Sequence, residues 1–293
     1  HGNLVTGPPL SENPSKQIGN EADPVPIPRQ IVKLDRLLGT GATCNVFEVE
    51  VKGTNTQPLK CAMKLCSSQK EHILFAIKHE KDILKQLTDV PNVTKLANVS
   101  NEYANDENCI FFPIYRPFKY ETNDQRLILK TIEPLISVLR TIHSRNIYHR
   151  DIRPDNILLD EQDNVVLADW GFSVYNSSPQ DHFAGTALFC AEEYAKSWFE
   201  YTPIRYTDRF DCESLLKCCY FMLRSKVRSK FDILNKAQKL QSAMDIWKEI
   251  ADNDTQFSHY LQQVAQNTDP YQVLYDFVNS YMPNDDNLQY DYD

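Results

Sequence analysis

The sequence predicts an α+β fold, in which a strand-rich part over about residues 31–117 precedes a larger, mainly helical part over about 118–282. Two observations support this prediction. Apolar and polar residues alternate early in the chain, and apolar residues recur at helical spacing after about residue 120. The composition, 42% hydrophobic and 24% charged, is that of an ordinary globular protein. A chain of 293 residues is long enough to bury the core of one large domain or of two small lobes.

The strand-rich part is predicted to contain three strands, a helix and two more strands. Residues 31–51 alternate and are followed by the turn signal Lys52-Gly53-Thr54-Asn55, and residues 59–65 form the next strand. Apolar residues at helical spacing then predict a helix over about 70–88. The two remaining strands are expected at 93–99 and 109–115.

The second part is predicted to be helical up to about residue 281. Its first apolar stripe contains Ile128, Ile132, Leu135, Leu139 and Ile142. Pro134 lies inside this stripe and should kink the helix or mark a new first turn, because proline lacks an N–H. Residues 211–223 are apolar enough for a buried helix, and 230–281 read as amphipathic helices.

Both ends of the chain are expected to lie outside the packed fold. Residues 1–30 hold six of the sixteen prolines and predict an extended lead-in, and 283–293 form an acidic tail that we expect to be frayed. The chain begins with His1-Gly2, which resembles a cloning scar, so it is expected to be one domain of a longer protein.

The bulk properties argue against several partners. A net charge of −9 disfavours nucleic acid, and no run of eighteen apolar residues predicts a membrane span. The eight cysteines form no C-x-x-C pair, so they are interpreted as core residues of a reducing compartment rather than as disulfides or metal ligands. We therefore expect an intracellular protein, either cytoplasmic or nuclear.

The motif most informative about chemistry is His149-Arg150-Asp151, followed by Asn156 and then by Asp169-Trp170-Gly171. It places a proton acceptor and two oxygen ligands for a metal on neighbouring short segments. Phosphoryl transfer from a nucleotide needs this combination, because the phosphates must be neutralised while the attacking hydroxyl is oriented.

Glycine and lysine positions upstream fit the same chemistry. The chain has only eight glycines, and Gly39 and Gly41 lie in a Gly-x-Gly segment that ends in Val46, where backbone could approach phosphate. Lys64 follows Cys61-Ala62-Met63 in an apolar strand, which is a costly place for an ammonium group without an anion. Glu80 lies on the apolar face of the predicted helix, so we expect a Lys64–Glu80 ion pair rather than a surface glutamate.

Together these segments closely resemble the eukaryotic-type protein kinases of the Ser/Thr type. The resemblance covers about residues 31–281 and implies a two-lobed kinase fold, with a small β-rich lobe over 31–117 and a helical lobe over 118–282. It also implies ATP and Mg²⁺ as cofactors and a protein substrate. Trp170 replaces the usual phenylalanine of D-F-G, as in casein kinase 2. We expect this larger ring to hold the loop in its active-like position.

The resemblance implies a role for each site residue. Asp151 would accept or orient the proton of the attacking hydroxyl, and Asn156 and Asp169 would hold Mg²⁺. Lys64, paired with Glu80, would contact the phosphates, and Arg153 stands where these kinases usually have a lysine that touches the γ-phosphate. The residues expected to bind ATP are Gly39, Gly41, Val46, Ala62 and Lys64. His149 is interpreted as a packing residue, and Phe112 is the candidate for the gatekeeper.

The segment from Gly185-Thr186 to Glu193 resembles the end of a kinase activation segment, although Glu192 stands where proline is usual. In the family this last glutamate usually pairs with an arginine near the C-terminus, and here no arginine follows Arg228. Asp211 would begin the buried helix and brace the catalytic loop. Ser177 or Ser178 is a candidate phosphorylation site facing Arg150, with an unmodified polar loop as the equal alternative.

The favoured interpretation is a protein serine/threonine kinase that also phosphorylates itself. The alternatives are a catalytically weak, ATP-binding pseudokinase scaffold, a small-molecule phosphotransferase of the aminoglycoside kinase type, and a purely structural interaction domain. A purely structural interaction domain offers no reason for Lys64 and Glu80 to point into the protein. The aminoglycoside type should lack the segment from Gly185 to Glu193.

Overall fold

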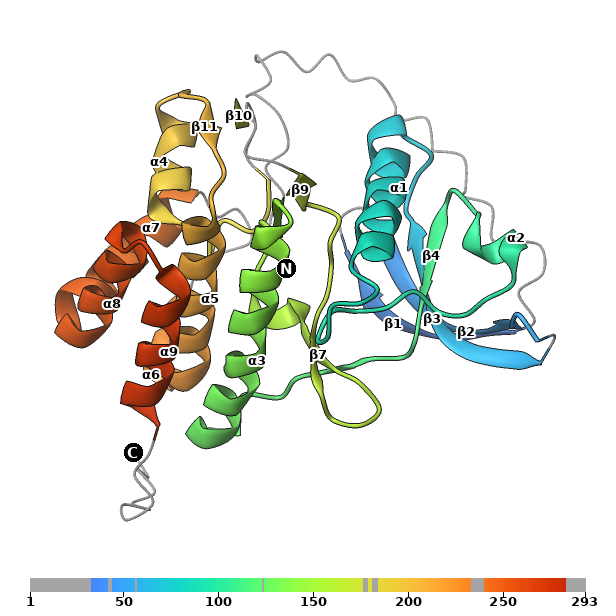
Figure 1. The fold of residues 1–293 in the computed structure, drawn as a ribbon, viewed down its shortest axis with the longest axis horizontal. Coiled ribbons are helices and arrows are strands. Elements are labelled where there is room, and N and C mark those ends of the chain that lie inside the picture. The colour runs from blue at the N-terminus through green and yellow to red at the C-terminus, as the bar shows by residue number, and fades with distance from the viewer. Residues whose placement is uncertain are drawn as a thin grey trace.

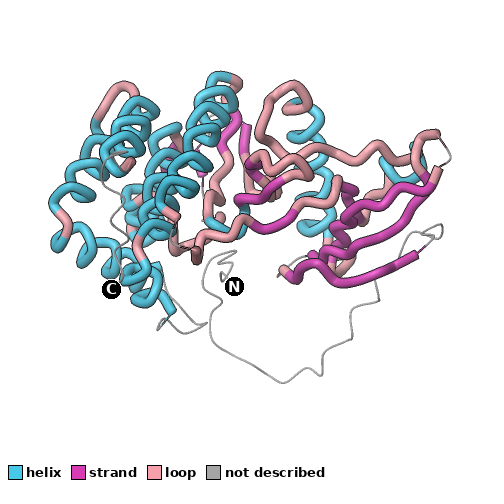
Figure 2. The backbone as a smooth tube through the Cα atoms, turned by 90° about the horizontal axis from the view of Figure 1, so that it is seen from below, coloured by secondary structure: helices cyan, strands magenta, loops and turns pink. Residues whose placement is uncertain are grey.

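The computed structural model describes residues 33–41, 44–55, 57–122, 124–175, 179–180, 184–232 and 240–282. The four-stranded sheet lies at one end of the molecule and most of the helices lie at the other, as Figure 2 shows. The predicted terminal segments 1–30 and 283–293 lie outside the described residues. The strand-rich first part and the mainly helical remainder agree with the predicted α+β class.

The first part is built on a four-stranded antiparallel sheet of order β1-β2-β3-β4. Its strands are β1 (Lys33–Thr40), β2 (Cys44–Lys52), β3 (Pro58–Cys66) and β4 (Cys109–Phe112). The helix α1 (Glu71–Gln86) lies against this sheet, and the short α2 (Asn101–Ala104) precedes β4 (Figure 1). Helix α1 matches the predicted span within one or two residues at each end.

One predicted strand of this part is wrong. Residues 93–99 form no strand but only isolated bridges, from Val93 to Leu167 and from Val99 to Gly53. The two bridging residues are buried, since Val93 and Val99 are 1% and 5% exposed. The alternation therefore reflects separate anchoring points on the core rather than a ladder. The last predicted strand is also shorter, because β4 ends at Phe112.

The helical part begins with α3 (Gln125–Ser144), whose N-cap Asp124 accepts a hydrogen bond from the Leu127 N–H. The helix runs through Pro134 without a break, so the alternative of a new first turn there is wrong. Helix α5 (Asp208–Leu223) packs against α3 and is buried along nearly its whole length, as predicted. The remaining helices are α4 (Glu192–Phe199), α6 (Ser225–Asp232), α7 (Leu240–Asn253), α8 (Thr255–Gln266) and α9 (Pro270–Tyr281).

Short strands just before α3 and between α3 and α4 shape the segments that face the first part. They are β5 (Arg116–Pro117), β6 (Ile147–Tyr148), β7 (Ile157–Leu159), β8 (Val165–Leu167) and β9 (Val174–Tyr175). Strand β6 pairs with β9, and β7 pairs with both β5 and β8. A further small pair joins β10 (Pro179–Gln180) to β11 (Ile204–Arg205). These pairings fix the ends of the loops that carry the predicted catalytic residues.

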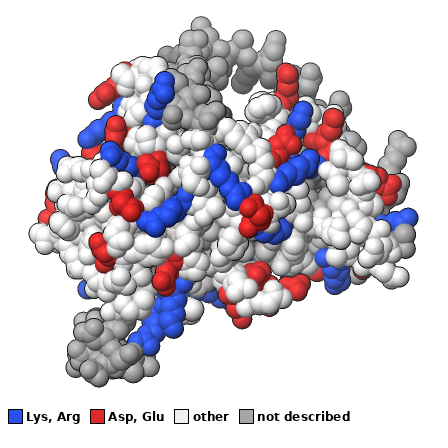
Figure 3. Space-filling model, viewed as in Figure 1, with Lys and Arg blue, Asp and Glu red and all other residues white. Residues whose placement is uncertain are grey.

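The eight cysteines all lie in described segments and form no disulfide there, and seven of them are buried, as expected of core residues. Within the described ranges no helix is both long and apolar enough to cross a bilayer. Acidic and basic side chains are intermixed over the face shown in Figure 3.

Candidate active site

The predicted catalytic residues converge from four separate segments. The loop between β6 and β7 carries Asp151, Arg153 and Asn156, and the turn after β8 carries Asp169. Lys64 comes from β3 and Glu80 from α1. Asp169 and Arg150, the residue before Asp151, have left-handed backbone with φ of 63° and 66°. Non-glycine residues avoid this region, so the surrounding structure must hold both in place.

Lys64 lies between two carboxylates. Its Nζ donates to Glu80 Oε2 at 2.7 Å and to Asp169 Oδ1 at 2.8 Å. Burial alone would lower the pKa of Lys64, but the charges of Asp169 and Glu80 raise it well above the ordinary value. The ammonium group therefore stays charged. The predicted ion pair between Lys64 and Glu80 is present, and the bond from Lys64 to Asp169 was not predicted.

The two carboxylates differ in their exposure. The Glu80 side chain is 2% exposed, whereas that of Asp169 is 41% exposed. Burial raises the pKa of Asp169, but the charge and hydrogen bond of Lys64 outweigh it and hold that pKa below the ordinary value. Asp169 is therefore an ionised carboxylate that a ligand could reach, whereas the buried Glu80 can only pair with Lys64 inside the protein.

Asp151 is buried and only partly satisfied by hydrogen bonds. The Asn156 Nδ2 donates to its backbone carbonyl at 2.7 Å and to its Oδ2 at 3.1 Å. Its other carboxylate oxygen, Oδ1, is buried without a hydrogen-bond partner among the described residues. Burial raises the pKa of Asp151, and the positive charge of Arg153 opposes the rise. A buried oxygen without a donor suits the acceptance of a proton from a hydroxyl group.

Arg153 connects the catalytic loop to the segment around Thr186. Its Nη1 donates to Thr186 Oγ1 at 3.0 Å, and its Nη2 lies 2.9 Å from Asp155 Oδ2. The guanidinium is thus held by a hydroxyl and an exposed carboxylate. Because the fork of an arginine is planar, these two contacts fix its direction as well as its position.

The donor groups fit a magnesium ion. The nitrogen of the Asn156 amide is used by Asp151, so its oxygen is the atom that could coordinate a metal, together with the Asp169 carboxylate. Mg²⁺ prefers such hard oxygen ligands and usually binds one or two protein carboxylates plus phosphates and water. The described residues contain no cluster of three or more His, Cys, Asp or Glu side chains suited to a metal. Phosphate oxygens and water would complete the coordination of such an ion.

The predicted nucleotide-binding residues lie next to one another in the sheet. Val46 of β2 pairs with Gly39 of β1 on one side and with Lys64 of β3 on the other. Beside Gly39 the space is open, since no described heavy atom lies within 4 Å of the position that a Cβ would take. At Gly41 a Cβ would lie 3.2 Å from the Cys44 carbonyl oxygen. The tip of this hairpin, 42–43, lies outside the described residues.

Two other predicted residues lie deeper in the same sheet. Ala62 of β3 is buried and pairs with Phe112, the last residue of β4. Phe112 is partly buried and packs against the main hydrophobic core. Its assignment as gatekeeper remains a prediction.

The catalytic loop is braced by Asp211, as predicted from its place at the start of the buried helix. The Asp211 carboxylate accepts hydrogen bonds from the backbone N–H of His149 at 2.7 Å and of Arg150 at 3.0 Å. His143 Nε2 lies 2.9 Å away, and the Tyr206 hydroxyl donates at 3.0 Å. These two partners were missed, because nothing in the local pattern shows which side chains will reach a buried carboxylate.

The activation-segment landmarks have mixed outcomes. Gly185 has a φ of +96°, and a Cβ there would lie 2.1 Å from the Arg150 carbonyl oxygen, so only glycine fits. Glu193 is exposed on α4. Ser177 and Ser178, the candidate phosphorylation sites, lie outside the described residues. The Arg150 Nε donates to the Phe172 carbonyl oxygen at 2.6 Å.

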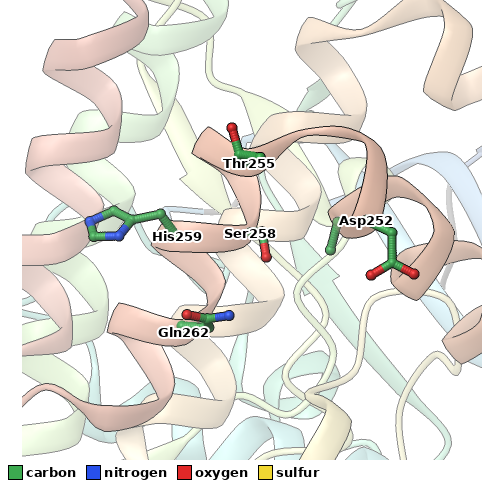
Figure 4. A pocket seen from close by; sticks show the side chains of 6 residues that line it. Asp252, Thr255, Ser258, His259 and Gln262 are labelled. Carbon is green, nitrogen blue, oxygen red and sulfur yellow. The ribbon is translucent and has the colours of Figure 1, made fainter.

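A polar hollow on the helical part is separate from this site. Its lining residues come from the end of α7 and from α8, and Figure 4 shows Asp252, Ser258 and His259 among them. These side chains belong to surface turns of two consecutive helices. None comes from the segments that carry Lys64, Asp151 or Asp169.

The comparisons with known proteins point to one family. A family model described as the protein kinase domain matches residues 32–283. The chain is 29% identical over 242 residues to calcium-dependent protein kinase 5 of Plasmodium falciparum, covering 76% of this chain and 40% of that protein. It is 30% identical over 148 residues to CBL-interacting serine/threonine-protein kinase 2 of Arabidopsis thaliana, covering 48% of this chain and 32% of that protein.

A third relative is the probable cAMP-dependent protein kinase catalytic subunit of Encephalitozoon cuniculi. It is 28% identical over 174 residues, which cover 55% of this chain and 52% of that protein. The matched part of this chain thus spans about half or less of the length of these relatives.

Proposed function

This chain belongs to the protein kinase family, and from that premise we propose that it transfers the γ-phosphoryl group of ATP to serine or threonine hydroxyls of proteins, itself included. The observation that carries this proposal is the convergence of Lys64, Asp151 and Asp169. An ionised lysine, a buried proton acceptor and a partly exposed ionised carboxylate come from three different segments. Buried, mutually paired charges of this kind cluster at functional sites, which supports a site that binds and transfers a phosphoryl group.

We propose the following division of labour. The Asp151 Oδ1 has no hydrogen-bond partner among the described residues. It takes the proton of the substrate hydroxyl while the oxygen of that hydroxyl attacks the γ-phosphorus. The bond between that phosphorus and the β,γ-bridging oxygen breaks, and ADP leaves. Arg153, held by Thr186, stabilises the negative charge on the γ-phosphoryl oxygens.

Lys64 and the metal ligands would hold the nucleotide. Glu80 keeps the Lys64 ammonium directed toward Asp169, where it can contact the phosphates. Asp169 and the Asn156 oxygen would hold Mg²⁺, which neutralises charge on the phosphate oxygens when bound. The backbone of Gly39 and Gly41 would cover the phosphates, while Val46 and Ala62 would contact the base.

The second candidate is a nucleotide-binding scaffold with weak catalysis. It is favoured by the exposed side chain of Glu193 and by Glu192 at the proline position, because both depart from the usual end of an activation segment. These departures concern the surface where a protein substrate would lie. They do not touch the residues proposed to hold the nucleotide.

One experiment separates the two candidates. Wild-type protein and Asp169→Asn are incubated with Mg²⁺ and ATP labelled on the γ-phosphate, with myelin basic protein as acceptor. Transfer that requires Mg²⁺ and is lost in the variant, with phosphoserine or phosphothreonine found by mass spectrometry, supports the kinase. No transfer, combined with thermal stabilisation by Mg²⁺–ATP, supports the scaffold. If the protein shows no transfer and no stabilisation by Mg²⁺–ATP, both candidate functions are contradicted.

A further inference from the structure

Three side chains from α5 and α7 hold the backbone just before α4 and at its first residue. Glu213 Oε1 accepts the N–H of Glu192 at 2.9 Å, and Lys217 Nζ donates to the Cys190 carbonyl oxygen at 2.7 Å. The third contact is from Trp247 Nε1 to the Leu188 carbonyl oxygen, at 2.5 Å. The three bonds reach every second residue of 188–192, so this short stretch is tied down along its whole length.

The charges in this group are buried and paired with each other. Glu213 and Lys217 are 8% and 4% exposed, and Lys217 Nζ lies 2.7 Å from Glu213 Oε1. The same ammonium lies 5.8 Å from the centre of the Trp247 ring. Burying an ion pair costs desolvation energy that is recovered only when further hydrogen bonds satisfy both ions. Here those further bonds are the ones to Cys190 and Glu192.

In the sequence pattern, Glu193 is the glutamate expected to anchor this stretch, but its side chain does not lie among these contacts. Glu193 is exposed on α4, while its neighbour Glu192 is held through its backbone N–H by Glu213. No arginine follows Arg228 in the chain. Among the described residues, the stretch from 188 to 192 is held by an ion pair within one buried helix, at i and i+4, whereas the Glu193 side chain is exposed.

The stretch also leads directly to the active site. The N–H of Phe189 donates to the Thr186 carbonyl oxygen at 3.4 Å, and the Thr186 hydroxyl accepts from Arg153 at 3.0 Å. Phe189 itself is buried and packs against the Trp247 ring at 6.3 Å between centroids. Movement of 188–192 would therefore carry Thr186 away from Arg153.

We propose that Glu213, Lys217 and Trp247 are positioning residues that replace Glu193 as the anchor of 186–192. They set the position of Thr186 and of the surface on which a protein substrate lies, and they leave nucleotide binding unaffected. The catalytic consequence rests on the proposed kinase function, whereas the anchoring itself does not.

The test compares Glu213→Leu/Lys217→Met and Trp247→Phe with Glu193→Gln as the matched control. The double variant keeps side-chain volume and leaves no unpaired buried charge, so it is expected to fold. Replacing a buried ion pair by apolar residues of similar size is often neutral or stabilising. Amide hydrogen exchange at Glu192, thermal unfolding, nucleotide affinity, and kcat and KM for myelin basic protein are measured for each.

In the double variant we expect the Glu192 amide to exchange at least about tenfold faster, since it loses a hydrogen bond to a charged group. The ratio kcat/KM for the protein substrate should fall by about tenfold or more, while nucleotide affinity changes by less than about twofold. Trp247→Phe should shift the same quantities in the same direction. Glu193→Gln should leave all of them as in the wild type.

Two results would contradict the proposed anchoring role of these residues. One is exchange at Glu192 that stays within about twofold of wild type in the double variant. The other is a larger loss of substrate turnover in Glu193→Gln than in the double variant. If wild-type protein transfers no phosphate at all, the kinase function fails, and the exchange rates alone still decide whether Glu213 and Lys217 hold the stretch.

Discussion

The Trp170 indole packs against the His149 imidazole, with ring centroids 4.6 Å apart and an interplanar angle of 72°. His149 Nε2 donates to the Ala168 carbonyl oxygen at 3.0 Å, and its Nδ1 accepts the Asp151 N–H at 3.2 Å. His149 is thus a packing residue that joins the turn of Asp169 to the loop of Asp151. The proposed metal ligand and the proposed base are parts of one packed unit.

Trp170→Phe is expected to destabilise the protein by about 1–3 kcal/mol. Trp170 is fully buried, and its Nε1 donates to the Leu167 carbonyl oxygen at 3.1 Å, a bond that phenylalanine cannot make. Urea denaturation measures the change, with Trp198→Phe on α4 as the control at a half-buried position. A loss no larger than that of the control would show that the indole does not secure this turn.

Glu80→Gln is expected to reduce phosphate transfer by about tenfold or more and to lower stability by about 1–3 kcal/mol. Glu80 accepts from Lys64 at 2.7 Å through one oxygen and from the Trp170 N–H at 3.3 Å through the other. Glutamine keeps only one of these two acceptors and places an NH2 donor at the other position. Initial rates and urea denaturation are compared with Glu71→Gln, an exposed glutamate of the same helix. Equal behaviour of the two variants would contradict a role for Glu80 in holding Lys64.

Arg153→Met is expected to shift the acid limb of the pH profile of kcat/KM to higher pH. Burial raises the pKa of Asp151 and the Arg153 charge opposes that rise, so removing the charge leaves the pKa still higher. The base must be deprotonated to act, and activity is then lost at a higher pH as the solution is acidified. Arg116→Met, at an exposed arginine, is the control. An acid limb that stays at the same pH or moves to lower pH would show that the limb does not report the ionisation of Asp151.

Asp211→Asn is expected to cost about 2–5 kcal/mol near neutral pH, because an amide cannot accept all the hydrogen bonds that the carboxylate accepts. Burial raises the pKa of Asp211, but the His143 hydrogen bond and charge and the backbone N–H of His149 bring it below the ordinary value.

The pH dependence of this cost has a definite sign. A carboxylate whose folded pKa is lowered contributes stability above its unfolded pKa, and the contribution is lost as pH falls through the folded value. The difference in the free energy of unfolding between wild type and Asp211→Asn should therefore become smaller as the pH is lowered. Denaturation at several pH values measures it, with the exposed Asp252→Asn as control. A difference that grows on acidification would mean that the ionised form is not the stabilising one.

Much of the site could be predicted because its residues lie in short, contiguous motifs. The loop from His149 to Asn156 and the turn at Asp169 depend on local backbone geometry, and the fold brings them together as expected. The Lys64–Glu80 pair was also predictable, because an ammonium in an apolar strand and a carboxylate on an apolar helix face each need an opposite charge.

What the sequence did not reveal depends on contacts between distant segments. Residues 93–99 alternate like a strand, yet their partners are single bridges to Leu167 and Gly53, which local pattern cannot distinguish from a ladder. Likewise, the missing arginine left Glu193 without an expected partner, and only the packing of α5 shows that Glu213 and Lys217 fix the neighbouring backbone.

The central claim is that Asp151 accepts the proton of the attacking hydroxyl in a working kinase. The most direct measurement is the rate of γ-phosphate transfer to a protein acceptor by wild type and by Asp151→Asn, at nucleotide concentrations that saturate both. We predict Mg²⁺-dependent transfer by the wild type and a loss of about a hundredfold or more in the variant, with nucleotide affinity preserved. Equal rates for the two proteins, or no transfer by a wild type that binds nucleotide, would contradict the claim.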